Sequence, residues 1–160
     1  MPPAPWNLRK DTTSASPQHA IIPTPDQEIE DSLLASAKLT VQQRILAQTQ
    51  AKLGTRAAER LERFMSYAEG WDEGQGQPIN LASLLAFERF LAIADLSGLS
   101  VALFMTVDGH VVINWLDSAD KLIEIEFQPD ALTCFAEADD SEKTVLIEEG
   151  AIKAYLAAYD

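Results

Sequence analysis

The sequence predicts an α+β fold, with N-terminal helices packed on one face of a C-terminal antiparallel sheet of four to five strands, and a short C-terminal helix. Apolar residues recur at helical spacing as far as about Leu96, whereas after Gly98 they alternate with polar residues, as in strands. Helices grouped before strands are typical of this class. With 160 residues, 47% of them hydrophobic, the chain is long enough for one core and too short for two.

Residues 1–23 are expected to form a flexible tail. They contain five prolines among serines, threonines and alanines, a composition that buries too little apolar surface to offset the entropy of ordering. Trp6 is either incidental in this tail or part of a short motif that becomes ordered on a partner. The rest is expected to be a single domain, 24–160, consisting of a helical part (24–68), a Gly-rich loop with a core helix (69–98) and an acidic sheet (99–160).

A first helix is predicted from about Asp26 to Leu53. Thr24 can cap it, and Pro25 suits its first helical position. A second capping pattern at Thr40 allows a break within it. An apolar stripe with a spacing of four residues runs along this helix through Ile29, Leu33, Ala37, Val41 and Ile45.

A second helix is predicted from about Arg56 to Tyr67. Arg56, Arg60 and Arg63 fall on one of its faces. We interpret this row as a solvated face paired with acidic neighbours. Contact with nucleic acid is the less favoured alternative, because the rest of the chain would repel phosphate.

The segment Gly70–Asn80 is the most distinctive loop of the chain. Its glycines permit backbone angles that other residues resist, and the indole of Trp71 can hold the loop against a core. A phosphate-binding loop is the less favoured alternative, because the Lys and Ser/Thr of such loops are missing. The predicted structural anchors are Trp71, Gly74, Gly76 and Pro78, joined by Trp115 further along the chain.

The chain after this loop is predicted to form a core helix followed by a hairpin. Asn80 can cap a helix over about Leu81–Leu96. The continuous apolar run Val101–Val107 is typical of a strand covered on both faces, and Asp108-Gly109 is a favoured turn at a hairpin tip.

The remaining strands show the alternating pattern more clearly. In Leu122–Phe127, Ile123, Ile125 and Phe127 should point into the core while Glu124 and Glu126 face water. The further elements expected are a returning strand over 111–116, a fourth strand near 131–136, a charged turn over 137–143, a fifth strand over 144–148 and a closing helix over 151–159.

The loop, helix and hairpin resemble a group of small, uncharacterised bacterial and phage proteins. Their shared pattern is a Gly-Trp-Asp-Gly-Tyr-Gly-x-x-Pro loop before a helix, then a hairpin with Asp-Gly at its tip and Trp on the returning strand. Here the loop is Gly70–Ile79, with Glu73 and Gln75 in place of Gly and Tyr, and the hairpin is Val107–Trp115. The resemblance covers roughly Glu69–Ala136; it implies an architecture and no catalytic residue.

Charge is distributed unevenly along the chain. The formal net charge is −13, and residues 99–160 carry −10 of it. Such an acidic chain opposes unspecific binding to nucleic acid or to an anionic membrane, and it favours a basic protein partner. The residues expected to contact that partner are Trp6, Glu124, Glu126, Glu137, Asp139 and Asp140.

No catalytic, cofactor or metal site is predicted. Cys134 excludes an internal disulfide, suits a cytoplasmic protein, and is expected to be a small core residue. His110 is expected to be a solvent-facing strand residue, although a site built from Asp108, His110 and Asp117 is conceivable. The pair Glu124 and Glu126 could bind a cation, but solvated strand carboxylates are commoner.

Three hypotheses about function follow from these observations. The favoured one is a non-enzymatic acidic module that docks on or inhibits a basic protein, like an antitoxin, an immunity protein or a phage inhibitor. The second is a structural component that self-associates through the amphipathic helix 26–53. The third is an enzyme of unknown reaction, which would need a deep pocket with convergent polar groups.

Overall fold

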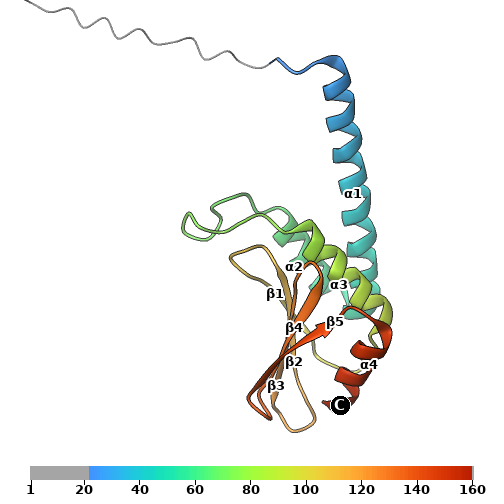
Figure 1. Ribbon diagram of the computed structural model, residues 1–160, viewed down its shortest axis with the longest axis vertical. Helices are drawn as coiled ribbons and strands as arrows, with labels where there is room; N and C mark the ends of the chain where they lie inside the picture. Colours follow the sequence, from blue (N-terminus) through green and yellow to red (C-terminus); the bar gives the residue numbers. More distant parts are fainter. Residues whose placement is uncertain (1–21, 160) are drawn as a thin grey trace, which may run out of the picture. The chain divides into compact units, whose positions relative to one another are not determined.

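A computed structural model describes residues 22–159 of the chain (Figure 1). Within the described residues the chain divides into two units, one ending at Ala35 and the other beginning at Ser36, inside the first helix. The predicted tail, 1–23, lies almost entirely outside the described residues, so its boundary stays a prediction. Trp6 lies outside the described residues.

Four helices and five strands make up the described residues. They are α1 (Pro25–Leu53), α2 (Thr55–Met65), α3 (Leu81–Ile93), β1 (Ala102–Met105), β2 (Val111–Leu116), β3 (Leu122–Phe127), β4 (Ala131–Ala136), β5 (Ser141–Leu146) and α4 (Glu149–Ala158). The predicted α+β class, with helices before an antiparallel sheet and a short closing helix, is confirmed. Within the described residues, no helix combines the length and the apolarity needed to cross a bilayer.

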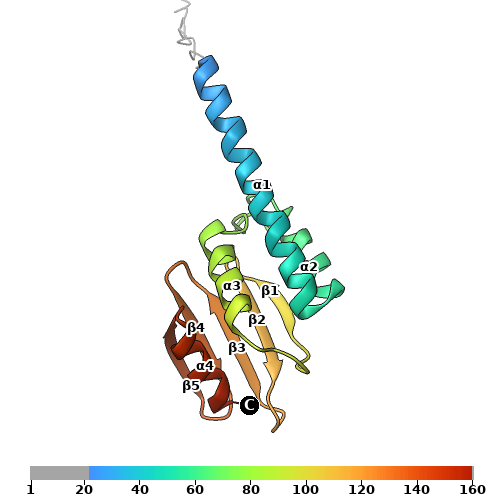
Figure 2. The same cartoon turned by 90° about the vertical axis from the view of Figure 1, so that its right-hand side faces the viewer.

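The sheet is an antiparallel meander in the order β1-β2-β3-β4-β5. Figures 1 and 2 show α3 and α4 along one side of it. On that side the strands present a continuous apolar row in which Leu103 pairs with Ile113, Ile113 with Ile125, and Ile125 with Cys134. These four side chains are buried, and the alternation of β3 had predicted this for Ile125.

Aromatic side chains fill the layer between α3 and the sheet. The rings of Phe87 and Phe90 pack edge-on against Phe127 of β3, with centroids 5.1 and 5.2 Å apart. Ile45 of α1 and Leu61 of α2 belong to the same buried cluster. The C-terminal part of the predicted apolar stripe in α1 is therefore used by the chain's own core.

The Gly70–Gln77 loop closes around Trp71. The indole Nε1 donates to the carbonyl oxygen of Gln77 at 2.9 Å, and the ring stacks on Tyr67 with centroids 5.0 Å apart. A Cβ at Gly76 would collide with this indole, so only glycine fits there without displacing it.

The end of this loop is joined to the hairpin tip and starts α3. The Gln77 amide donates to the carbonyl of Val107 at 2.7 Å, and the Asn80 amide donates to the carbonyl of Gly109 at 2.8 Å. The side chain of Asn80 then accepts from the amide of Ser83 at 3.1 Å, which is the predicted helix cap.

Several element boundaries differ from the prediction. The helix α1 continues through Thr40, whose hydroxyl donates to the carbonyl of Ser36 within the helix at 3.0 Å. The backbone of Ala94 turns extended, which ends α3 at Ile93. The fifth strand begins at Ser141, because its charged residues pair with β4 from Ala136 back to Ala131.

The prediction that Val101–Val107 is a strand covered on both faces is wrong. The strand β1 is short, pairs with β2 alone and lies at the sheet edge. Phe104 is 38% exposed, and the guanidinium of Arg60 in α2 lies over its ring at 4.7 Å. Arg56, Arg60 and Arg63 are exposed, as predicted for a solvated row, and Arg60 in addition lies over an aromatic ring.

Candidate functional site

We call the face of the sheet opposite α3 and α4 the open face; at its β1 edge the guanidinium of Arg60 from α2 lies over Phe104. Side chains alternate between the two faces of each strand, so the strand register identifies its members. They are Ala102, Phe104, Val112, Asn114, Leu116, Leu122, Glu124, Glu126, Ala131, Thr133, Phe135, Glu142, Thr144 and Leu146.

The open face is acidic. Glu124 and Glu126 lie on the central strand β3, and Glu142 lies in register with Glu124 across Phe135. Strand geometry separates these carboxylates by about 7 Å along β3 and by about 10 Å across the sheet. None of the fourteen open-face residues in the five described strands is Lys or Arg. The strand residues of the open face therefore carry net negative charge, and the guanidinium of Arg60 from α2 lies at their β1 edge, over Phe104.

Exposed apolar side chains lie around these carboxylates. Phe104 lies on β1, Leu116 at the end of β2 and Leu146 at the end of β5, and all three are exposed. Apolar residues around a charged centre can supply the desolvated contacts that dominate binding energy. The open face thus combines both components of a protein-binding surface.

His110 is paired with a carboxylate of the open face. Its Nδ1 lies 2.7 Å from Oε1 of Glu126, and the His110 side chain is 19% exposed. The prediction of a solvent-facing histidine is therefore wrong. The β2–β3 register brings the two groups together, because Glu126 pairs with Val112, two residues after His110. Beside this pair, the side-chain amide of Asn114 donates to Glu124 at 3.5 Å.

The other acidic residues predicted to contact a partner lie in the β4–β5 turn. Glu137 accepts from the Leu122 amide at 2.9 Å and from Lys121 at 3.3 Å, and these bonds lower the pKa of its carboxyl. It therefore ties this turn to the start of β3 as well as carrying charge.

Asp139 and Asp140 also serve the turn itself. Asp139 accepts from the hydroxyl of Ser141 at 2.6 Å and from that of Tyr159 at 3.0 Å, and these bonds lower its carboxyl pKa. Asp140 adopts a left-handed backbone with φ of 48°. The structure therefore separates the six predicted contact residues into an open-face pair, a turn group and Trp6, which lies outside the described residues.

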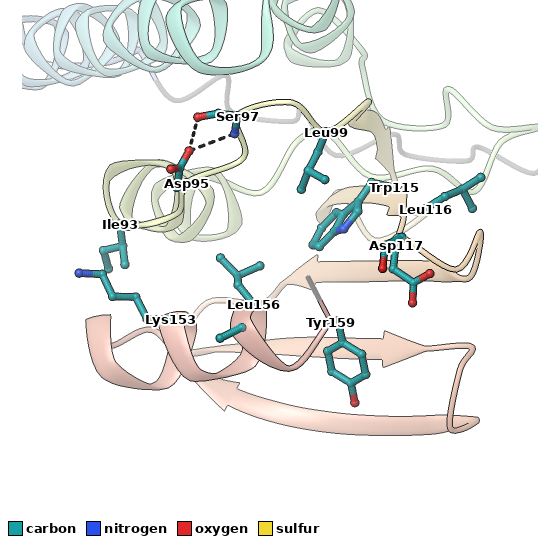
Figure 3. Close-up of a pocket in the computed structure, with 12 residues that line it drawn as sticks. Ile93, Asp95, Ser97, Leu99, Trp115, Leu116, Asp117, Lys153, Leu156 and Tyr159 are labelled. Carbon is teal, nitrogen blue, oxygen red and sulfur yellow. Dashed lines mark hydrogen bonds between the residues drawn. The ribbon is translucent and has the colours of Figure 1, made fainter.

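A pocket of about 590 Å³ lies on the helix side of the molecule, between the end of α3, the end of β2 and α4. Leu99, Trp115 and Leu156 face its space in Figure 3. Trp115, a predicted structural anchor, is 4% exposed and belongs to the core cluster. The sequence offered no signal for this pocket, because its walls come from three distant segments.

The polar groups of this pocket already have local partners. Asp95 accepts from the amide and the hydroxyl of Ser97, which lowers its carboxyl pKa. Asp117 accepts from the amide of Lys121 at 2.9 Å. Lys153 is paired with Glu149 at 2.5 Å. These groups stabilise turns and a helix, and the arrangement contains no paired nucleophile and base among the described lining residues.

The conceivable site of Asp108, His110 and Asp117 is not assembled. Asp108 and His110 lie before β2 and Asp117 after it, and a six-residue strand spans about 20 Å. Cys134 is 1% exposed, and burial raises the pKa of its thiol to about 12, which disfavours a reactive thiolate. Among residues 22–159 no group of three His, Cys, Asp or Glu side chains is placed to hold a metal ion.

Comparisons with protein-family models, with curated proteins and with solved structures found no match. The resemblance based on the Trp71 loop and the Asp108-Gly109 hairpin therefore stays a prediction.

Proposed function

We propose that this chain is a non-enzymatic module that docks on a basic protein through the open face of its sheet, as an antitoxin, an immunity protein or a phage inhibitor would. The observation that carries the proposal is the pair Glu124 and Glu126 on the central strand of a face without Lys or Arg among its strand residues. The proposed compartment is the cytoplasm, because the one cysteine, Cys134, is a buried free thiol.

Charge and apolar contacts have separate tasks in this proposal. The carboxylates attract the basic partner and orient it during approach, an effect that salt screens over about 10 Å. Phe104, Leu116 and Leu146 then provide apolar contact after docking. Association should therefore slow as salt rises, while dissociation should depend mainly on the apolar residues.

The test compares capture by two charge-matched variants of the full chain. The open-face variant is E124Q/E126Q/E142Q, and the control is E59Q/E62Q/E69Q, which removes the same charge from exposed positions in α2 and the following loop. Each variant is immobilised, exposed to lysate of the native host at low salt, and assayed for affinity to any basic protein recovered.

We expect the wild type and the control to retain the same basic protein. The open-face variant should bind it about tenfold more weakly, since three solvent-accessible charges each contribute roughly 0.5 kcal/mol. Equal affinity of the two variants, or the absence of a reproducible basic partner, contradicts the proposal.

A further inference from the structure

The N-terminal unit exposes an apolar strip on α1. Ile29, Leu33 and Leu34 are 58%, 66% and 69% exposed, and we call these three residues the α1 strip. They begin the same apolar stripe whose later member Ile45 is fully buried in the other unit. Large apolar side chains that lie next to one another and stay exposed to water indicate a binding surface.

Carboxylates border the α1 strip. Asp26, Ile29, Glu30 and Leu33 share one helix face, because they follow the i, i+3, i+4, i+7 spacing. Glu28 and Asp31 add two further negative charges, and no Lys or Arg occurs between residues 22 and 35. A surface that covers Ile29 and Leu33 must therefore also face the carboxylates of Asp26 and Glu30.

We propose that the α1 strip docks as an amphipathic helix in an apolar groove rimmed by Lys and Arg on the protein partner. This inference rests on the proposed function for the basic character of that partner. The groove covers the apolar residues, and its cations pair with the bordering carboxylates, which is the helix-in-groove mode of recognition.

Charge complementarity favours this occupant over a second copy of the segment. A second copy would add four more carboxylates and no cation from residues 22–35, so like charges would face each other along the contact. A basic groove converts the same four charges from a repulsive set into an attractive one.

The experiment measures binding of the full chain to a synthetic amphipathic helical peptide made of Lys and Leu. The strip variant I29Q/L33Q/L34Q keeps the charge and uses a residue that favours helices. The matched control is L81Q/L85Q, which removes exposed apolar residues from α3, outside both proposed binding surfaces. A Glu and Leu peptide of the same pattern tests the sign of the charge, and circular dichroism checks that each variant is folded.

We expect the strip variant to bind the Lys and Leu peptide at least about tenfold more weakly than the wild type, and D26N/E28Q/E30Q/D31N to lose most of the salt dependence. The L81Q/L85Q control should bind the Lys and Leu peptide like the wild type. Equal binding by the strip variant, or equally tight binding of the Glu and Leu peptide, overturns the inference.

Two further measurements separate this inference from the proposed function. Analytical ultracentrifugation of the full chain should show no dimer that depends on the α1 strip; a dimer lost in the strip variant would assign the strip to a second copy and overturn the inference. If the host partner is lost by E124Q/E126Q/E142Q but fully retained by the strip variant, the proposed function stands and the inference about α1 fails.

Discussion

The two faces of the sheet are built from alternate residues of the same strands, yet their chemistry is opposite. On β3, Ile123, Ile125 and Phe127 are fully buried, while Glu124 and Glu126, which alternate with them, point to the open face. Because the side-chain period of a strand is two, a shift of one residue in register would exchange the faces. The difference shows that one segment can specify the core and a charged surface together.

Among the tests of this difference, the substitution Ile125→Ala should have the largest effect on stability. It removes a fully buried side chain and leaves a cavity, so the free energy of unfolding should fall by about 2–5 kcal/mol. The neighbouring Glu124→Ala on the open face should cost less than about 1 kcal/mol. Urea denaturation followed by tryptophan fluorescence measures both, and similar losses would mean that the two faces do not differ energetically.

The buried thiol of Cys134 provides a second test, through pH. Burial raises its pKa from 9.0 to about 12 in the folded chain. Above pH 9 the unfolded chain loses this proton while the folded chain keeps it. Stability should therefore fall by about 1.4 kcal/mol per pH unit between pH 9 and 12.

The control for this pH dependence is Cys134→Ala, which should flatten the decline between pH 9 and 10. The pKa of the buried phenol Tyr155 is also raised by burial, from an ordinary value of 10.0. Tyr155 therefore lowers the stability mainly above pH 10, outside this interval. Unfolding curves at closely spaced pH values provide the measurement. Parallel declines in the two proteins would show that the thiol does not ionise differently in the folded state.

The smallest expected effect is that of the His110–Glu126 pair on the open face. Both side chains remain partly exposed, so water and salt screen their interaction. A double-mutant cycle of His110→Ala and Glu126→Gln should give a coupling free energy below about 1 kcal/mol. A coupling comparable to the Ile125→Ala loss would mean that this face contributes to the core.

Local patterns were sufficient to predict much of the fold. The alternation in Leu122–Phe127 predicted which side chains are buried, and the cap at Asn80 predicted where α3 begins. Both signals depend on neighbours within a few residues. The continuous apolar run that includes β1 was ambiguous, because only the tertiary arrangement places β1 at the sheet edge, where Phe104 stays exposed and contacts Arg60 of α2.

The candidate site was less predictable than the fold. Glu124 and Glu126 were identified as outward-facing, but Glu142, the apolar residues around them and the His110 contact depend on strand register. Register is set by pairing between segments that are distant in sequence, so composition and spacing do not encode it directly. The exposed start of α1 was hidden for a related reason, since its stripe has the same spacing whether it is buried or not.

The close approach of Gly109 to Pro78 has a consequence for how the molecule opens. A side chain at Gly109 would collide with the carbonyl oxygen of Pro78, and the same contact region holds the bond from Asn80 to Gly109 and that from the Val111 amide to the hydroxyl of Ser83. The hairpin tip therefore cannot move away from the Pro78–Asn80 segment without also breaking the hydrogen bonds that join it to the first turn of α3. Amide protons at the two sites should exchange with solvent as one cooperative unit.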